Sequence, residues 1–163
     1  MTMSTSEICG LDIEKIASDN CVLLLWATFP QLAEALQVIE AWGFQYKTVA
    51  FVWLKQNKSG KGWFFGLGFW TRGNVEICLL AVKGKPKRIS NRVSQLLISP
   101  LRGHSQKPDE TRDKIVELLG NLPRIELFAR EKTEGWDIWG NEVASDLDIG
   151  NYVDTPGGDF NVR

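Results

Sequence analysis

The chain has 163 residues, of which 44% are hydrophobic and 24% are charged, and its formal net charge is −1. Such a length and composition predict one globular domain, and no apolar run is long enough to cross a bilayer, so no membrane partner is expected. The single histidine excludes a metal site built from several histidines, and the three scattered cysteines do not form a disulfide framework. The lack of a disulfide framework favours the reducing cytoplasm as the location of the protein.

The N-terminal part predicts a short helix followed by a buried strand. Ser4 and Glu7 stand in the pattern of a capping box, which predicts a helix over residues 5–16. The continuous apolar run at residues 21–27 has the length of a strand. A strand without polar alternation is buried on both faces, and this is typical of a parallel sheet.

A second helix and a hairpin follow. The helix opens at Pro30, in a position where proline is favoured, and ends at Gly43. Strands at residues 48–54 and 75–82 enclose a loop rich in glycine and lysine, and we expect them to pair as a hairpin. The expected buried stripe of the helix consists of Leu32, Ala35, Leu36 and Ile39.

The C-terminal half predicts a helix between two strands, at residues 94–99, 108–120 and 124–128 in chain order. The expected buried stripe of this helix consists of Ile115, Val116, Leu118 and Leu119. Residues 144–163 are acidic and weakly apolar, which predicts a flexible tail after a domain at 1–143. Alternating helices and apolar strands predict an α/β fold whose sheet is mainly parallel, with one antiparallel hairpin.

The basic residues are concentrated in the middle of the chain. Residues 47–107 hold twelve lysines and arginines and a single acid, Glu76. Basic residues interleaved with aromatic ones favour nucleic acid, because cations neutralise phosphates and rings stack on bases. Phe51 and Trp53 alternate in a predicted strand and are expected in the core, whereas Trp63 and Trp70 either stack on bases or fill the core. The expected nucleic-acid contacts are Lys55, Lys58, Lys61, Trp63, Trp70, Arg72, Lys83, Lys85, Lys87 and Arg88.

A series of short motifs carries a resemblance to a known family. In chain order they are Thr2-Met3-Ser4 with Glu7-Ile8, Leu24-Leu25-Trp26, Trp42-Gly43-Phe44, Gly66-Leu67-Gly68-Phe69-Trp70 with Arg72 and Glu76, Val82-Lys83-Gly84, His104-Ser105-Gln106-Lys107-Pro108-Asp109-Glu110, Glu126-Leu127-Phe128-Ala129-Arg130 and Trp139-Gly140-Asn141. Together they resemble the adenine methyltransferase family typified by the catalytic subunit of the mRNA adenosine methyltransferase. The family also has bacterial and phage members that act on DNA. The resemblance implies a Rossmann-like methyltransferase sheet.

The resemblance also implies S-adenosylmethionine as the cofactor. In this interpretation Glu126 accepts hydrogen bonds from ribose hydroxyls, while Lys107 and Arg130 hold the carboxylate or the ribose. Alternatively, Glu126 and Arg130 form an exposed pair at the end of a strand, and Asn141 either contacts the nucleoside or caps a turn. We expect His104 to orient a loop. The implied cofactor-binding residues are Lys107, Glu126, Phe128, Arg130, Asn141 and Glu142.

The family's catalytic loop, Asp-Pro-Pro-Trp, is absent from this sequence, in which no two prolines are adjacent. In the family this loop lies upstream of the segment that resembles Thr2, on a strand in the middle of the sheet. Its polar groups accept the hydrogens of the adenine amine, and its aromatic residue stacks on the extruded base. No catalytic residue is therefore assigned. The resemblance implies a domain truncated on its N-terminal side, with a gap or an exposed edge beside the strand at 22–27.

The sequence leaves two functions open. The first is methylation of the exocyclic amine of adenine in nucleic acid, with DNA favoured over RNA and this chain as a part or fragment of the enzyme. The second is a catalytically inactive nucleic-acid-binding relative that assists an active methyltransferase. The expected partners are DNA or RNA, together with another methyltransferase subunit or a second copy of the chain.

Overall fold

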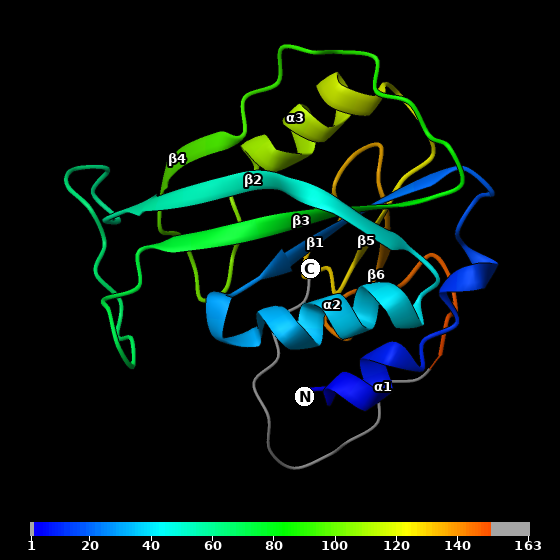
Figure 1. Ribbon diagram of the computed structural model, residues 1–163, viewed down its shortest axis with the longest axis horizontal. Helices are drawn as coiled ribbons and strands as arrows, with labels where there is room; N and C mark the ends of the chain where they lie inside the picture. Colours follow the sequence, from blue (N-terminus) through cyan, green and yellow to red (C-terminus); the bar gives the residue numbers. More distant parts are fainter. Residues whose placement is uncertain (1, 151–163) are drawn as a thin grey trace.

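The computed structural model describes residues 2–150 and contains a four-stranded sheet and a two-stranded sheet (Figure 1). The large sheet has the order β1-β3-β2-β4, and β5 pairs with β6. The strands are β1 (Cys21–Ala27), β2 (Gln45–Gln56), β3 (Val75–Lys83), β4 (Leu96–Pro100), β5 (Ile125–Leu127) and β6 (Asp137–Trp139).

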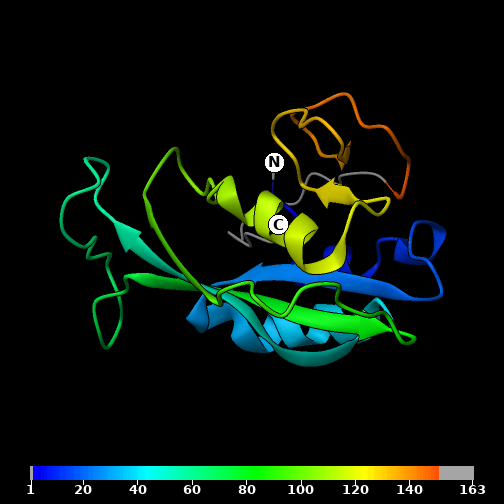
Figure 2. The ribbon, with the colours of Figure 1, turned by 90° about the horizontal axis from the view of Figure 1, so that it is seen from above.

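The helices lie on both faces of the large sheet. α2 (Leu32–Ala41) covers one face, and α3 (Glu110–Leu119) lies on the other with the β5–β6 pair (Figure 2). α1 (Thr5–Cys9) packs beside α2, where Trp42 Nε1 donates a hydrogen bond of 2.8 Å to the Ile8 carbonyl. Short 3₁₀ turns at Ile13–Lys15 and Phe29–Gln31 complete the helical elements. No helix within residues 2–150 has the length and apolar character needed to cross a membrane.

Strand direction agrees with the prediction, but strand pairing does not. β1, β2 and β4 run in one direction because β3 is antiparallel to both β1 and β2, and β2 is parallel to β4. The expected hairpin of β2 and β3 is therefore confirmed. The expectation of mainly parallel pairing is wrong for the large sheet, since β3 inserts between β1 and β2 and only the β2–β4 pair is parallel.

The main core lies between the large sheet and α2. Because side chains alternate along a strand, successive residues of β1 and β3 enter different layers. The layer toward α2 contains Leu25, Ala27, Ile77, Leu79 and Ala81 together with Val38 and Ile39 of α2. The smaller cluster on the α3 side contains Trp26, Phe51, Trp53, Cys78 and Leu97, so Phe51 and Trp53 are core residues as predicted.

Three predicted helical features differ from the structure. The capping box of Ser4 and Glu7 is confirmed, but α1 ends at Cys9 because Gly10 caps it. In α2, Leu36 is exposed and Val38 takes its place in the core. In α3 none of the four predicted stripe residues is fully buried; Thr111 is the buried residue of that helix.

The first part of the predicted tail contacts the domain. Ile149 is buried in the main core, and its carbonyl accepts a hydrogen bond of 3.1 Å from the Asp12 amide. Asp146 Oδ2 accepts a hydrogen bond of 2.8 Å from the Ile138 amide of β6. Residues 144–150 are thus tied to the fold by packing and by hydrogen bonds. The rest of the predicted tail, 151–163, lies outside the described residues.

Candidate functional site

A buried cluster of charges lies where β2 ends and β3 begins. Glu76 is only 3% exposed and contacts two lysines. Its Oε1 accepts from Lys107 Nζ, and its Oε2 lies 3.0 Å from Lys55 Nζ. A buried carboxylate requires such partners, because an unpaired charge in a low-dielectric interior is strongly disfavoured. The cluster joins β2, β3 and the loop before α3.

Two tryptophans form the wall of this cluster. The rings of Trp26 and Trp53 meet edge to face with their centroids 6.3 Å apart. Lys107 Nζ lies 5.9 Å from the Trp26 centroid, and Lys55 Nζ lies 5.0 Å from that of Trp53. Trp53 Nε1 donates 3.0 Å to the Ser99 carbonyl of β4. The site therefore lies at the carboxyl ends of β1, β2 and β4, where ligands of α/β sheets commonly bind.

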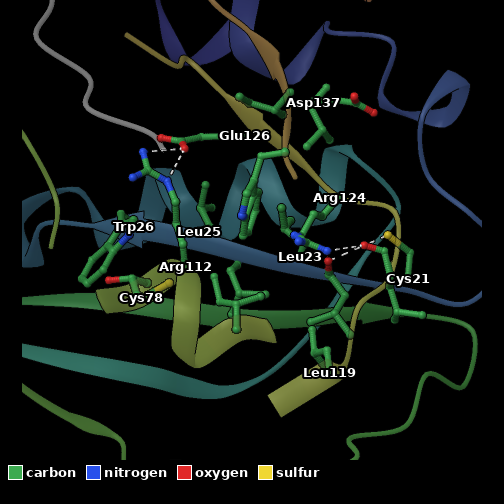
Figure 3. Close-up of a pocket in the computed structure, with 18 of the residues that line it drawn as sticks. Cys21, Leu23, Leu25, Trp26, Cys78, Arg112, Leu119, Arg124, Glu126 and Asp137 are labelled. Carbon is green, nitrogen blue, oxygen red and sulfur yellow. Dashed lines mark hydrogen bonds and ion pairs between the residues drawn. The ribbon is translucent and has the colours of Figure 1, made fainter. Parts of the chain in front are cut away.

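A cavity of about 820 Å³ extends from this cluster along β1. Its walls are β1, α3, β5 and the loops that flank them (Figure 3). Three of the predicted cofactor residues, Lys107, Glu126 and Arg130, line the cavity together with His104. The other three predicted residues, Phe128, Asn141 and Glu142, are not among its lining residues.

Glu126 is held by an arginine that the sequence interpretation did not include. Arg112 Nε and Nη2 lie 2.9 Å and 2.8 Å from Glu126 Oε2, and Arg112 Nη1 donates 2.9 Å to Asp109 Oδ1. Both Glu126 and Arg112 are half-buried. The alternative of an exposed Glu126–Arg130 pair is not what the structure shows, because Glu126 pairs across to α3.

Arg130 connects two loops at the same end of the cavity. Its Nη1 donates 2.9 Å to the His104 carbonyl, and its Nε lies 3.6 Å from Glu142 Oε1. His104 thus takes part in loop geometry through its backbone. Phe128 has a left-handed φ of 58° and packs edge to face on Trp139, with centroids 5.4 Å apart. Asn141 is exposed beside the end of β6.

The predicted nucleic-acid residues fall into separate groups. Lys58, Lys61, Trp63, Trp70 and Arg72 belong to the loop between β2 and β3. Lys83 ends β3, and Lys85, Lys87 and Arg88 follow it at the opposite end of the sheet. The nine residues of β3 separate these groups by roughly 30 Å, so they form two surfaces. Lys55 belongs to neither surface, since it is paired with Glu76.

The β2–β3 loop exposes its aromatic rings. Trp70 and Phe69 are 99% and 97% exposed, and Trp63 is 46% exposed, so Trp63 and Trp70 do not fill the core. Arg72 supports the loop from within, because its Nε and Nη2 donate to the carbonyls of Gly66 and Phe65 at 2.8 Å and 3.0 Å. The loop therefore presents these rings to solvent and does not pack them in the core.

The thiols show no arrangement suited to chemistry. Burial raises the pKa of Cys78, which lies in the core, and also raises the pKa values of the Cys9 and Cys21 thiols. Such thiols are weak nucleophiles because little thiolate forms near neutral pH. Within the described part of the chain, no group of three His, Cys, Asp or Glu side chains is placed to hold a metal ion.

Two site residues were missed in the sequence, and each left a signal. Glu76 is the only acid in the basic stretch 47–107, and its isolation there indicates a structural partner for lysines. Arg112 stands in the first turn of α3, after Asp109 and Glu110. Its pairing with Glu126 joins residues 14 positions apart and depends on the packing of α3 near β5.

Comparisons with known proteins identify the family. The MT-A70 family profile matches residues 1–142. The chain belongs to the MT-A70 family. It is 40% identical over 144 residues to the Type II methyltransferase M.MunI of a Mycoplasma species, a match that covers 87% of this chain and 59% of that relative.

More distant MT-A70 relatives come from eukaryotes. The chain is 27% identical over 146 residues to the N(6)-adenosine-methyltransferase catalytic subunit METTL3 of Homo sapiens, which covers 87% of this chain and 25% of that protein. It is 27% identical over 145 residues to the N(6)-adenosine-methyltransferase MT-A70-like protein of Arabidopsis thaliana, and this match covers 87% of this chain and 21% of that protein. The chain therefore spans about three fifths of M.MunI and about a quarter of the eukaryotic relatives.

Proposed function

We propose that this chain is part of an S-adenosylmethionine-dependent methyltransferase that modifies the exocyclic amine of adenine in nucleic acid. The observation that carries the proposal is the MT-A70 match over residues 1–142, which includes every element around the cavity beside β1. DNA is favoured over RNA because identity is higher to the Type II methyltransferase, at 40%, than to the adenosine methyltransferases, at 27%. We propose a Rossmann-like sheet, as membership of this family implies, and a cytoplasmic location.

The cavity fits a nucleoside-bearing cofactor in size and in the kind of groups it offers. Pockets for ligands of this size are mostly apolar, with a few polar side chains that fix orientation. Here apolar residues of β1 and α3 form the walls of the cavity, and the polar side chains of Lys107, Glu126 and Arg130 also line it. When bound, S-adenosylmethionine would supply the methyl group. Glu126 would accept from ribose hydroxyls, and Lys107 and Arg130 would face the carboxylate.

We propose that the β2–β3 loop contacts the nucleic acid. Its exposed rings, Trp63, Phe69 and Trp70, offer faces on which bases stack, and Lys58 and Lys61 are exposed beside them. The second basic group, Lys83 to Arg88, would follow the phosphate backbone farther along. This division predicts that the β2–β3 loop supplies most of the base-dependent part of the binding free energy. The group from Lys83 to Arg88 would supply a salt-dependent part from a different surface.

The second candidate is a catalytically inactive relative that binds nucleic acid and assists an active methyltransferase. The specific observation in its favour is the lack of an Asp-Pro-Pro motif in the sequence. On either proposal we expect little or no methyl transfer by this chain alone. The partner that completes the activity would be another methyltransferase subunit or a second copy of the chain.

Isothermal titration calorimetry with S-adenosylmethionine separates the two candidates. The first candidate predicts saturable binding by folded, monodisperse protein. Glu126→Gln is expected to weaken it about tenfold, since a charged hydrogen-bond acceptor is lost. Glu117→Gln, an exposed change on α3, is the matched control. No heat of binding by the folded wild-type chain would remove the first candidate.

The second measurement is transfer of a tritiated methyl group to adenine-containing DNA and RNA, with fluorescence anisotropy on the same oligonucleotides. Binding of the oligonucleotides without cofactor binding supports the inactive relative. Turnover by this chain alone at the rate of a complete methyltransferase would contradict our expectation.

A further inference from the structure

The loop between β2 and β3 projects beyond the end of the large sheet and divides into two lobes (Figures 1 and 2). The first lobe is a tight turn, in which the Gly60 amide donates a hydrogen bond of 2.8 Å to the Asn57 carbonyl. It carries Lys58 and Lys61, and both side chains are exposed. We call this lobe, residues 57–62, the basic turn.

The second lobe, residues 66–73, is closed at its base by hydrogen bonds, and we call it the apolar tip. The Gly66 amide donates 2.6 Å to the Gly73 carbonyl. The Arg72 side chain donates to the carbonyls of Phe65 and Gly66. These bonds give the tip a defined backbone shape although its side chains lie outside the core.

The tip presents an aliphatic side chain beside two aromatic rings. Leu67 and Phe69 are each 97% exposed, and Trp70 is 99% exposed. Stacking of bases on rings accounts for Phe69 and Trp70, but not for Leu67, since a leucine side chain has no π-face. Leucine and phenylalanine side chains act as wedges in other proteins, where they enter a base step and partly unstack it. Leu67 therefore favours a wedge over a simple platform for single strands.

The charge around the tip fits a nucleic acid. Residues 41–75 contain no aspartate or glutamate, and the loop itself carries Lys58, Lys61 and Arg72. The basic turn belongs to the same loop as the tip, so its lysines can neutralise phosphates next to an inserted side chain. Such anchoring is needed because unstacking a base step costs free energy.

The tip stands at the end of the sheet where the cofactor is proposed to bind. The loop begins after Gln56 of β2 and ends before Val75 of β3. The next residue of β3, Glu76, pairs with Lys107, which lines the cavity beside β1. An enzyme that modifies a base within a duplex must first take that base out of the stack. A wedge at this end of the sheet would open the duplex on the side of the methyl donor.

We propose that the apolar tip is a wedge for duplex DNA. Leu67 and Phe69 enter a base step, Trp70 stacks on a base exposed there, and the basic turn holds the adjacent phosphates. This inference rests on the proposed nucleic-acid contact of the β2–β3 loop. It deepens that proposal because it names duplex DNA as the ligand and unstacking as the action. Insertion needs no bound cofactor.

Two assays report unstacking without knowledge of a target sequence. In the first, topoisomerase I relaxes a plasmid in the presence of the chain, so that an inserted wedge unwinds the duplex and leaves negative supercoils once the protein is removed. In the second, 2-aminopurine replaces adenine at TA steps of a short duplex, where unstacking is easiest, and its emission rises when it unstacks. We expect both signals from the saturating wild-type chain without S-adenosylmethionine.

Removal of apolar volume from the tip should abolish most of both signals. Leu67→Ala and Phe69→Ala should each reduce them at least about threefold at saturating protein. Leu96→Ala shortens an exposed leucine of β4 and is the matched control, which should leave both signals nearly unchanged. Because the two tip side chains are almost fully exposed, urea denaturation should show wild-type stability for both tip variants.

The backbone shape of the tip provides a second pair of variants. A Cβ atom at Gly68 would overlap the Thr71 carbonyl oxygen, whereas a Cβ atom at Gly73 meets nothing within 4 Å. Gly68→Ala therefore reshapes the tip while it keeps every other side chain, and it should lower both signals. Gly73→Ala should not lower them.

Replacement of both lysines of the basic turn separates anchoring from insertion. Lys58→Ala combined with Lys61→Ala should weaken duplex binding and lower the slope of log K against log salt by about 2. At saturating protein the 2-aminopurine emission should persist, because the tip is intact. Loss of that emission at saturation would assign the unstacking to the lysines and contradict the wedge.

Duplex binding without unwinding and without a rise in emission would overturn the wedge and leave the nucleic-acid contact standing. Equal signals from Leu67→Ala and Leu96→Ala would also overturn it. If the chain binds no duplex at all, the proposed nucleic-acid contact of the loop fails together with the wedge. Sedimentation alone and with anionic phospholipid vesicles tests the other occupants. A dimer or a vesicle complex that Leu67→Ala dissociates would assign the tip to a second copy or to a lipid surface instead.

Discussion

Glu76 and Lys107, 31 residues apart in the sequence, form a buried ion pair beneath the Trp26 ring. The pair ties the start of β3 to the loop before α3, and Lys55 gives Glu76 a second cationic partner. One carboxylate thus contacts two lysines, and the cluster keeps a net positive charge at the end of the sheet where the cofactor is proposed to bind.

Removal of the Glu76 charge is expected to destabilise the fold more than removal of the Lys107 charge. Glu76→Gln leaves two ammonium groups without their carboxylate, and breaking a buried pair from one side costs about 3–5 kcal/mol. Lys107→Met leaves Glu76 paired with Lys55 and should cost less. Urea denaturation of both variants, with Glu117→Gln as the exposed control, measures the difference. Equal stability of Glu76→Gln and wild type would contradict the interpretation.

Replacement of Trp53 by alanine is expected to destabilise the fold, whereas replacement of Trp70 by alanine is expected to leave the stability almost unchanged. Trp53 is 2% exposed and donates to Ser99, so Trp53→Ala should lower the free energy of unfolding by about 3–5 kcal/mol. Trp70 is 99% exposed, so Trp70→Ala should change stability by less than about 0.5 kcal/mol. If the β2–β3 loop stacks on bases, Trp70→Ala weakens single-stranded DNA binding by about 1–3 kcal/mol in anisotropy titrations. Unchanged binding would exclude that role.

Gly140 is required by the close approach of β6 to the Phe128–Arg130 turn. A Cβ atom at Gly140 would lie 2.3 Å from the Ala129 carbonyl oxygen, and backbone cannot move aside cheaply. Gly140→Ala should therefore destabilise the protein by about 1–3 kcal/mol or more. At Gly73 an added Cβ meets nothing within 4 Å, so Gly73→Ala is the matched control. Thermal unfolding of both variants provides the comparison, and equal melting temperatures would show that the turn relaxes.

Asp146 should make stability depend on pH on the acid side. A hydrogen bond from Lys132, then one from the Ile138 amide, hold the pKa of this carboxyl below its usual value of 3.8. A lowered folded-state pKa contributes stability that is present above pH 3.8 and is lost as pH falls through the folded-state pKa. Asp146→Asn keeps an acceptor for Ile138 but removes the charge. Its melting temperature should be below that of wild type at pH 7, and the two should converge below pH 3.8. A constant difference down to pH 2 would point to packing instead.

Local patterns predicted most elements of the fold. Three features were predicted correctly because each depends on residues close in the chain. They are the apolar strand β1, the capping box of Ser4 and Glu7, and the hairpin of β2 and β3. β6 was missed, since it has three residues and owes its pairing to β5. The stripe of α3 was misplaced because periodicity shows which side is apolar but does not show what covers it.

The site was predictable only in part. The motifs indicated Lys107, Glu126 and Arg130, and the structure places these three around one cavity. Their partners were not predictable, since Glu76, Arg112 and the His104 carbonyl reach them across 31, 14 and 26 residues. The basic stretch read as one surface in the sequence, but β3 divides it between two ends of the sheet.

The sequence by itself determined the family, the order of helices and strands, and the residue types at the cofactor end of the sheet. These follow from short motifs and from periodicity, which are local properties. The tertiary structure alone decided that β3 lies between β1 and β2, that Glu76 contacts two lysines, and that β1 faces a cavity across from β5. Those features depend on which distant surfaces exclude water together, and local patterns do not specify that choice.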